Sequence, residues 1–467
     1  MTHRVSVVVV IVLALLLASC GGSATDIVKG TSPAGSKMAE TPTVVSGTSE
    51  ATTPVSPEAT STRVAVATPT VAPSPTAKAE AIQVESFGFG QPEGDRSVGW
   101  AFTVINPNST LAFEGSQFQI ALMDEAGTVL ETDSGYLSLL MPSERSAVAG
   151  SAYLPEGAVA ASMTVSVKDG RSSSIETTAV FTSSKVTYFP SDYFSYVTGV
   201  ISNPYKKDLS DLRMSAVAYD ASGAIIGGGF TYLNLIPAEG KTGAAVSVTT
   251  AGEPASVELF AAISGLTLLD DSTAKQPEKP LVLHAQGFGQ PADDRQVGWG
   301  FIVENPNTGQ QVETSSYRIT AYDVDGRVIG TDDGYMTLLA PGEKVGYGGD
   351  IYIPEGTTAA SVDVQIMAGK PSDSEAGPML STANATYIAD PYSSKVTGTV
   401  SNLSDTTLDT IRVSAIAYDA AGAIIGGGFT YVDFVPARGN AAAEIYVTVG
   451  GEPASVELHA ALTSVSR

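Results

Sequence analysis

This chain of 467 residues contains little cysteine, histidine and tryptophan, at one, three and two residues. The single cysteine, Cys20, excludes a disulfide within the chain. His3 lies near the N-terminus, and His284 and His459 have no histidine at the matching position of the duplicated half described below. A Ser-His-Asp arrangement present in both halves is therefore excluded, and zinc lacks its nitrogen and sulfur ligands. We expect no metal and no cofactor.

Basic residues are also scarce, because 25 Lys and Arg stand against 49 Asp and Glu, for a formal net charge of −24. No cluster of Lys and Arg is available to neutralise phosphates, so the sequence predicts no nucleic-acid partner. The acidic excess favours solubility and repulsion from anionic surfaces.

One long apolar run is present, at residues 5–18, directly after His3 and Arg4. It is shorter than the roughly 20 residues of a bilayer-spanning helix, which predicts a signal peptide over residues 1–19. Residues 17–21 read LASCG and resemble the lipobox of bacterial lipoproteins. The resemblance implies a lipid on the Cys20 sulfur, cleavage before Cys20, and an exported protein anchored to the cell membrane with its folded part extracytoplasmic. An uncleaved signal anchor is the alternative.

Residues 20–80 are rich in Thr, Ser, Pro and Ala and contain no aromatic residue. Such a composition cannot bury enough surface to offset the entropy of ordering, so the sequence predicts a disordered stalk. A flexible coil of about 60 residues spans on the order of 45 Å. Glycosylation of the stalk stays open.

The rest of the chain repeats itself at a constant offset of 199 residues. Residues 88–108 match residues 287–307 at 15 of 21 positions, and residues 214–240 match residues 413–439 at 19 of 27. An offset that never changes indicates two copies of one structural unit. A functional residue of this unit is therefore expected twice.

Each half contains two related segments with the same marks: an Asn after a strand, a D-x-x-G turn, an aromatic strand and a proline. We therefore predict four domains in two duplicated pairs, at 81–169, 178–265, 281–368 and 379–467, with a linker at 266–280. The marks are Asn106, Asp124, Gly127, Tyr136 and Pro142; Asn203, Asp220, Gly223, Tyr232 and Pro237; Asn305, Asp323, Gly326, Tyr335 and Pro341; and Asn402, Asp419, Gly422, Tyr431 and Pro436.

Hydrophobic residues alternate along the predicted strands. Val98, Trp100, Phe102 and Val104 share one face, which is the pattern of a half-buried strand. Because Phe102 and Val104 share the strand face of Trp100, a core position for it and for Trp299 is favoured over a sugar-stacking one. Short strands at regular spacing, with no helical periodicity after the signal peptide, predict an all-β tandem array of β-sandwiches.

Residues 197–203 (VTGVISN) and 218–223 (AYDASG) resemble the FxLYD domain, an immunoglobulin-like module of bacterial surface proteins. Residues 395–402 and 417–419 repeat the match, and the first and third segments are more divergent. The resemblance implies four immunoglobulin-like β-sandwiches on an exported protein of a kind that is often a lipoprotein. It implies no established catalytic residues.

Other candidate chemistry has a structural alternative that we favour. Asp323 to Asp333 place several carboxylates around one hairpin, where calcium binding stays open, but hairpin geometry explains the spacing. Asp95 and Asp294 each precede an arginine, which favours an ion pair over acid catalysis. The glycine-rich pieces at 88–90 and 227–229 are expected to mark bulges or close approach of backbones.

A run of aromatic residues is the candidate contact surface. The run exceeds what one strand face can bury, so it predicts either an exposed contact surface or a joint between domains. We therefore expect a non-enzymatic, membrane-anchored surface lipoprotein that works in adhesion, scaffolding or ligand presentation, toward an unknown protein or glycan ligand. The alternatives are an array of carbohydrate-binding modules and an enzyme. The aromatic residues of this candidate contact surface are Tyr188, Phe189, Tyr193, Phe194 and Tyr196, with Tyr387 and Tyr392.

Overall fold

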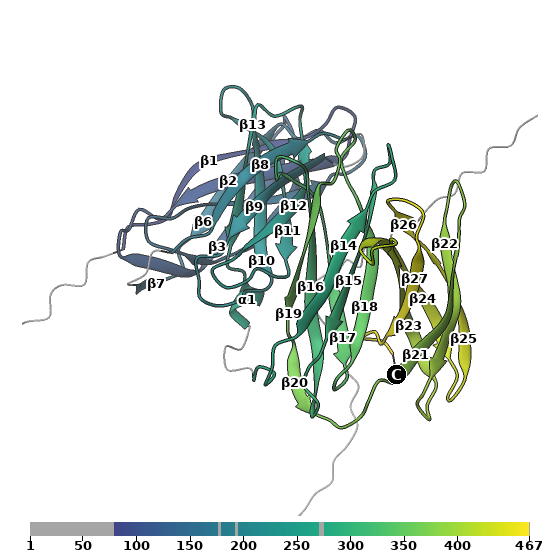
Figure 1. Ribbon diagram of the computed structural model, residues 1–467. Coiled ribbons are helices and arrows are strands. Elements are labelled where there is room, and N and C mark those ends of the chain that lie inside the picture. Colours follow the sequence, from purple (N-terminus) through teal and green to yellow (C-terminus); the bar gives the residue numbers. More distant parts are fainter. Residues whose placement is uncertain (1–78, 176–178, 192–194, 270–274, 467) are drawn as a thin grey trace, which may run out of the picture. The chain divides into compact units, whose positions relative to one another are not determined.

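The computed structural model describes residues 79–175, 179–191, 195–269 and 275–466 (Figure 1). The predicted signal peptide, Cys20 and nearly all of the predicted stalk lie outside the described residues, as do Tyr193 and Phe194. Residues 75–467 form one compact unit. The described part is antiparallel β-structure with one short helix, which confirms the predicted all-β array of β-sandwiches.

Domain 1 is a sandwich of two sheets. One sheet has the strand order β1-β2-β5, and the other has the order β4-β3-β6 with β7 added to β3. Trp100 and Phe102 of β2 are buried between the sheets against Phe118 of β3. The bounds are β1 (Gln83–Gly90), β2 (Ser97–Ile105), β3 (Leu111–Met123), β4 (Val129–Leu140), β5 (Arg145–Tyr153), β6 (Ser162–Lys168) and β7 (Arg171–Ser174).

Domain 2 has six strands in the order β13-β10-β11-β12-β9-β8. Only two residue pairs join β11 to β12, and the two ends of the sheet enclose a core that includes Met214, Val246 and Leu259. The bounds are β8 (Thr182–Phe189), β9 (Ser195–Ser202), β10 (Leu212–Tyr219), β11 (Ile225–Leu233), β12 (Lys241–Thr250), β13 (Ser256–Ala262) and helix α1 (Gly265–Leu269).

Domain 3 repeats domain 1, with sheets β14-β15-β18 and β17-β16-β19, and β20 added to β16. Trp299, Phe301, Tyr317 and Tyr347 fill its core. The bounds are β14 (Val282–Gly289), β15 (Gln296–Glu304), β16 (Gln310–Tyr322), β17 (Val328–Leu339), β18 (Lys344–Tyr352), β19 (Ser361–Met367) and β20 (Lys370–Asp373). The sequence predicts that domains 1 and 3 end at residues 169 and 368. Strands β7 and β20 come after these positions and still pair with β3 and β16.

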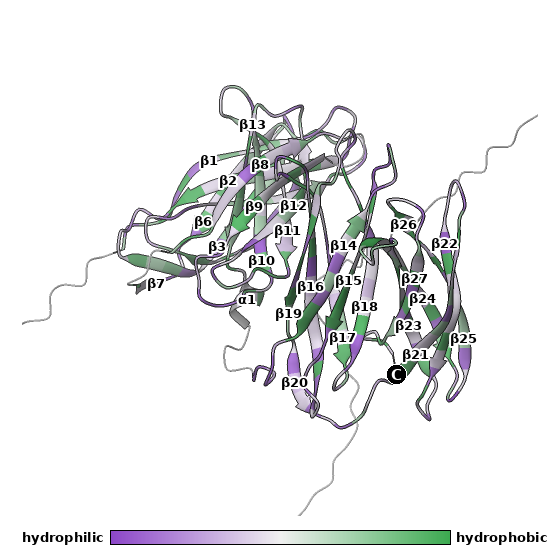
Figure 2. Ribbon diagram, viewed as in Figure 1, coloured by the Kyte–Doolittle hydropathy of each residue, from purple (hydrophilic) through white to green (hydrophobic). Residues whose placement is uncertain are grey.

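Domain 4 repeats domain 2 but has two separate sheets, β21-β22-β25 and β26-β24-β23-β27. Figure 2 shows apolar and polar residues mixed along its strands, as expected where one face of a sheet is buried. The bounds are β21 (Leu380–Ile388), β22 (Lys395–Asn402), β23 (Leu408–Tyr418), β24 (Ile424–Val435), β25 (Asn440–Tyr446), β26 (Thr448–Val449) and β27 (Ser455–Ala461).

The glycine-rich strands hold the domains of each pair together. A Cβ atom on Gly90 of domain 1 would lie 1.8 Å from the Ile226 carbonyl oxygen of domain 2, and one on Gly289 of domain 3 would lie 1.8 Å from the Ile425 oxygen of domain 4. The expected close approach of backbones is confirmed at these strands. Small residues also line the contact between domains 1 and 2, where Ala101 and its neighbours pack against Val217.

A different contact joins the two halves. Strands β9 and β12 of domain 2 lie against β16 and β17 of domain 3. The Thr198 hydroxyl donates to the Val328 carbonyl oxygen at 2.6 Å, and Arg318 Nε donates to the Gly243 oxygen at 2.9 Å. Each of these four residues is buried.

Candidate functional site

The predicted contact aromatics separate into different environments. Tyr188 and Tyr387 are half-buried against the cores of their own domains, and their hydroxyls lie 3.1 Å from the hydroxyls of Ser195 and Ser394. Tyr392, in contrast, is 96% exposed. The contact aromatics that the structure describes are therefore not brought together into one surface.

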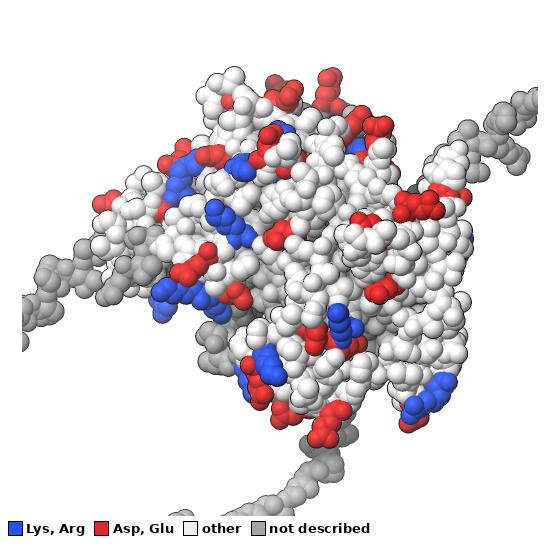
Figure 3. Space-filling view, viewed as in Figure 1, with Lys and Arg blue, Asp and Glu red and all other residues white. Residues whose placement is uncertain are grey.

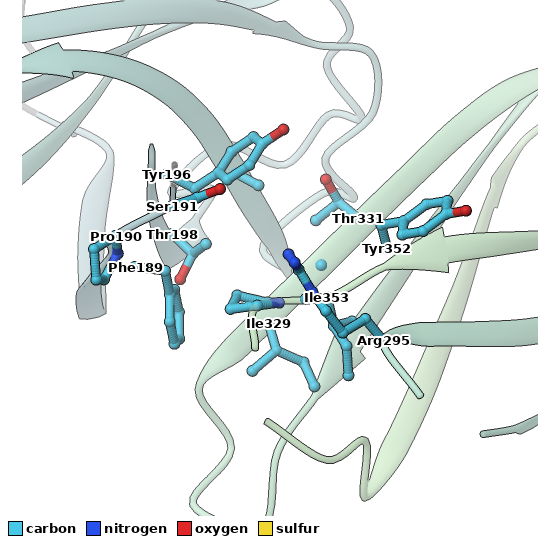
Figure 4. Close-up of a pocket in the computed structure, with 13 residues that line it drawn as sticks. Phe189, Pro190, Ser191, Tyr196, Thr198, Arg295, Ile329, Thr331, Tyr352 and Ile353 are labelled. Atoms are coloured by element: carbon cyan, nitrogen blue, oxygen red, sulfur yellow. The ribbon is translucent and has the colours of Figure 1, made fainter. Parts of the chain in front are cut away.

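Phe189 and Tyr196 line a pocket of about 250 Å³ between domains 2 and 3 (Figure 4). Arg295 and Tyr352 line it from domain 3, and Arg295 Nε donates to the Ile353 oxygen at 3.1 Å. Phe189 also packs against the core of domain 3. This part of the predicted run thus contributes to a joint between domains.

A second aromatic cluster was not singled out as a site from the sequence, and it occurs in both halves. We call each copy an aromatic groove. The first is formed by Tyr136 on β4 with Arg213, Phe230 and Tyr232 on β10 and β11. The second has Tyr335, Arg412, Phe429 and Tyr431 at the matching positions.

The phenylalanine, its neighbouring tyrosine and the arginine have the same geometry in both aromatic grooves. The ring centroids of Phe230 and Tyr232 are 5.9 Å apart at 88°, and those of Phe429 and Tyr431 are 5.7 Å apart at 83°. The guanidinium carbon of Arg213 lies 4.0 Å from the Phe230 centroid, and that of Arg412 lies 3.8 Å from the Phe429 centroid. Cation–π contacts of this kind orient the ring and the charge together.

The arginine of each groove is fixed by the neighbouring domain. Arg213 donates to the Ala149 oxygen of domain 1 at 2.6 Å, and Arg412 donates to the Gly348 oxygen of domain 3 at 2.9 Å. Burial lowers the pKa of Arg213, while Tyr232 and Asp133 act in the opposite direction. Each groove is therefore assembled at the contact between the two domains of a pair.

The tyrosines of both grooves remain open to solvent. Tyr136 is 62% exposed and Tyr335 is 57% exposed, and Tyr232 and Tyr431 are 43% and 52% exposed. In the first half the groove has a volume of about 980 Å³ and extends to Leu266 of helix α1. Exposed rings beside a fixed cation are typical of contact surfaces.

Acidic side chains border both grooves. Asp133 lines the first, and Asp332 occupies the matching position in the second. The pKa of Asp332 is raised to about 6, mainly by burial and also by the Asp333 charge, against the opposing effect of the Asp333 backbone amide and Arg412. The groove therefore offers aromatic faces, a cation and carboxyl oxygens within one surface.

The hairpin considered for calcium uses its first carboxylate internally. Asp323 accepts hydrogen bonds from the backbone amides of Asp325 and Arg327 at 3.0 and 2.8 Å, and from Arg327 Nε at 2.7 Å. Asp333 lies 3.3 Å from Arg318 Nη1. Among the described residues, no group of three or more His, Cys, Asp or Glu side chains is placed to hold a metal ion.

The remaining candidates have structural partners. Asp95 accepts from the Ser97 amide at 3.0 Å, a contact that lowers its pKa. His284 Nε2 lies 2.5 Å from the Glu304 carboxylate. Trp100 and Trp299 are fully buried in the cores of domains 1 and 3. Figure 3 shows basic and acidic side chains interspersed on the visible face.

One sequence signal could have revealed the aromatic grooves. Residues 227–232 and 426–431 both read GGGFTY. The middle glycine of each run, Gly228 or Gly427, faces the neighbouring domain. The Phe and Tyr two and four residues after it are on the same strand face and remain partly exposed. A repeated F-x-Y directly after a glycine run therefore predicts exposed rings at the margin of a domain contact.

Comparisons with known proteins identify no family. No family model matches the chain, and no curated protein matches it. A solved structure described as "Biofilm associated protein - BSP domain" has a TM-score of 0.12 and 10% identity, over 83% of this chain and 94% of that one. Dimeric latent PorU from Porphyromonas gingivalis has a TM-score of 0.13 and 10% identity, over 62% and 34%. Escherichia coli alpha-2-macroglobulin activated by porcine elastase has a TM-score of 0.13 and 12% identity, over 82% of this chain and 42% of that one.

Likeness at this level assigns no function, and the resemblance to FxLYD domains stays a prediction. In the part of the chain that the structure describes, no helix has the length and apolar character needed to cross a membrane.

Proposed function

We propose that this protein is a non-enzymatic surface lipoprotein, anchored to the cell membrane through Cys20, that works in adhesion and ligand presentation. The observation that carries the proposal is the duplicated aromatic groove. Two exposed tyrosines, a phenylalanine and a fixed arginine occur in both halves, and the Phe–Tyr and Arg–Phe pairs have the same geometry in each. Two equivalent contact sites on one chain strengthen attachment to a repeating surface through effective concentration.

The lipobox and the stalk support this function from the sequence. Two or more acyl chains on Cys20 give durable anchoring, because each buried CH₂ contributes about 0.8 kcal/mol. A coil of about 60 residues would hold the folded domains on the order of 45 Å from the membrane. The proposed ligand is a protein or a glycan outside the cell, and the proposal includes no nucleic-acid partner.

Carbohydrate binding is the second candidate, and the composition of the groove favours it. Sugar rings have apolar faces and polar rims, which match aromatic faces bordered by charged groups. Tyr232, Arg213 and Asp133 supply these elements in the first groove. A glycan array with labelled full-length chain is expected to give signals that Tyr232→Ala together with Tyr431→Ala removes.

The adhesion function is tested on cells that display the full chain. The Tyr232→Ala/Tyr431→Ala double variant is expected to lose at least tenfold in adherence to surfaces coated with envelope or extracellular material. Tyr153→Ala is the matched control, because Tyr153 is an exposed tyrosine that lies under Arg96, at 4.3 Å, outside the grooves. Equal adherence of the double variant and the control would overturn the proposal.

A further inference from the structure

Among the described residues, two outer sheet faces have no neighbouring domain packed against them. The head face is the outer side of the β4-β3-β6 sheet in domain 1, and the tail face is the outer side of the β21-β22-β25 sheet in domain 4. The equivalent faces of domain 3 and domain 2 within the same chain pack against each other. We propose that the tail face of one copy docks on the head face of a second copy, repeating the contact between domains 2 and 3.

A valine at the same position of domains 1 and 3 differs in exposure, which shows that no domain covers the head face. Val328 of domain 3 is 0% exposed under domain 2, whereas Val129 at the matching position of domain 1 is 54% exposed. Arg318 is likewise buried, and its counterpart Gln119 is exposed. Strands β3 and β4 have the same pairing in domain 1 as β16 and β17 have in domain 3. The difference in exposure therefore comes from domain 2, which covers domain 3 alone.

The tail face shows the same difference. Gly243 of domain 2 is buried against domain 3, whereas its counterpart Ala442 on β25 is exposed. Thr198 is buried, and its counterpart Thr397 on β22 is half-buried.

The central hydrogen bonds of the internal contact can be repeated between copies. Thr198 donates to the Val328 carbonyl oxygen, and Thr397 retains the hydroxyl for the Val129 oxygen. Arg318 donates to the Gly243 oxygen, and the Gln119 amide is also a donor for the carbonyl at the matching position. Both bonds use backbone acceptors, which any sequence supplies.

The residues at the closest approach change in a complementary way. A Cβ atom on Gly243 would lie 2.2 Å from Thr320 Cγ2, so glycine is required opposite threonine. In the proposed contact the pair becomes Ala442 opposite Ala121. The methyl group added on one side is matched by atoms removed on the other, which preserves the packing volume.

Several bonds of the internal contact lack a matching side chain. Lys185 Nζ donates to the Asp325 oxygen at 2.7 Å and Gln365 Nε2 to the Lys241 oxygen at 2.6 Å, and their counterparts Asn384 and Ser166 are shorter. Asn234 donates to the Tyr317 oxygen at 3.3 Å, but its counterpart Asp433 is an acceptor when ionised. The contact between copies is therefore weaker than the contact within the chain. A head-to-tail contact joins two different faces, so each added copy leaves a free head and a free tail for the next unless the rotation closes a ring. Of the first aromatic groove, Tyr136 lies on the head face, opposite Gln117 on β3, whereas Arg213, Phe230 and Tyr232 belong to domain 2. The proposal does not rest on the adhesion function.

The test uses the full chain in detergent micelles, studied by sedimentation velocity over a range of concentrations. The unmodified chain is expected to form species that grow with concentration. Ala442→Arg blocks the tail face and Ala121→Arg blocks the head face, and each variant alone is expected to stay monomeric. Mixed together they are expected to form a dimer and nothing larger, because one free head meets one free tail.

A monomeric unmodified chain at all concentrations would overturn the proposal, as would association that survives Ala442→Arg. Variants that associate alone but gain nothing on mixing would indicate a symmetric contact and would also overturn it. Val129→Glu, at a 54% exposed position, replaces Ala121→Arg if that variant fails to fold, as judged by circular dichroism. Gly451→Ala, in open space on a loop of domain 4, is the control that leaves association unchanged.

Discussion

Gly289→Ala tests how the paired domains are held together. The new Cβ atom would lie 1.8 Å from the Ile425 oxygen and 2.3 Å from the Gly450 nitrogen, and both neighbours are backbone atoms of domain 4. An ordinary contact begins at 3.4 Å, so the two sheets have to separate by about 1.6 Å at this point. A gap of even 0.5–1 Å loses roughly a quarter to a half of the dispersion energy of the atoms involved. We expect a loss of about 1–3 kcal/mol in the free energy of unfolding.

Urea unfolding followed by tryptophan fluorescence measures this loss, because Trp100 and Trp299 are buried in domains 1 and 3. The transition reported by Trp299 is expected at lower urea in Gly289→Ala, and the transition reported by Trp100 is expected to be unchanged. Gly451→Ala is the control, since no atom lies within 4 Å of its new Cβ. If Gly289→Ala unfolds at the same urea concentration as this control, the close approach of domains 3 and 4 is refuted.

Three further predictions concern other parts of the chain. Burial raises the pKa of Glu144 to about 7, so the folded chain retains a proton and stability falls as pH rises from about 4.5 to 7; Glu144→Gln should flatten that fall in urea midpoints measured across this range. Asn106 is buried and donates to the Leu111 and Met141 oxygens at 2.7 and 2.9 Å; Asn106→Ala should cost about 1–3 kcal/mol in thermal unfolding, with an unchanged melting temperature contradicting this role. Cys20→Ala should abolish incorporation of radiolabelled palmitate, and retained label would refute the lipid anchor.

The strands and their cores were predictable from the sequence because hydrophobic alternation depends on local geometry. The pattern from Val98 to Val104 predicts one buried face, and Trp100 and Phe102 occupy it in the structure. The glycines near 88–90 also predicted close approach of backbones. Their partner strand could not be predicted, because the approach of Gly90 to Ile226 depends on how two domains pack.

The candidate site was harder to predict for the same reason. Exposure of Phe230 and Tyr232 depends on where domain 1 stops covering β11, and the repeated GGGFTY is the one local pattern that marks this limit. Phe189 illustrates the converse, because it was a candidate contact residue and packs against the core of domain 3. Alternation within one strand thus identifies buried faces, whereas contacts between domains decide which outer faces remain free.

The claim that two equivalent aromatic grooves perform the contact function is tested most directly by the single variants Tyr232→Ala and Tyr431→Ala, each displayed on cells in the adherence assay. The account predicts partial losses of similar size from the two single variants and near-complete loss from the double variant. Full adherence after either double or single substitution, or complete loss from one single variant with no effect of the other, would contradict it.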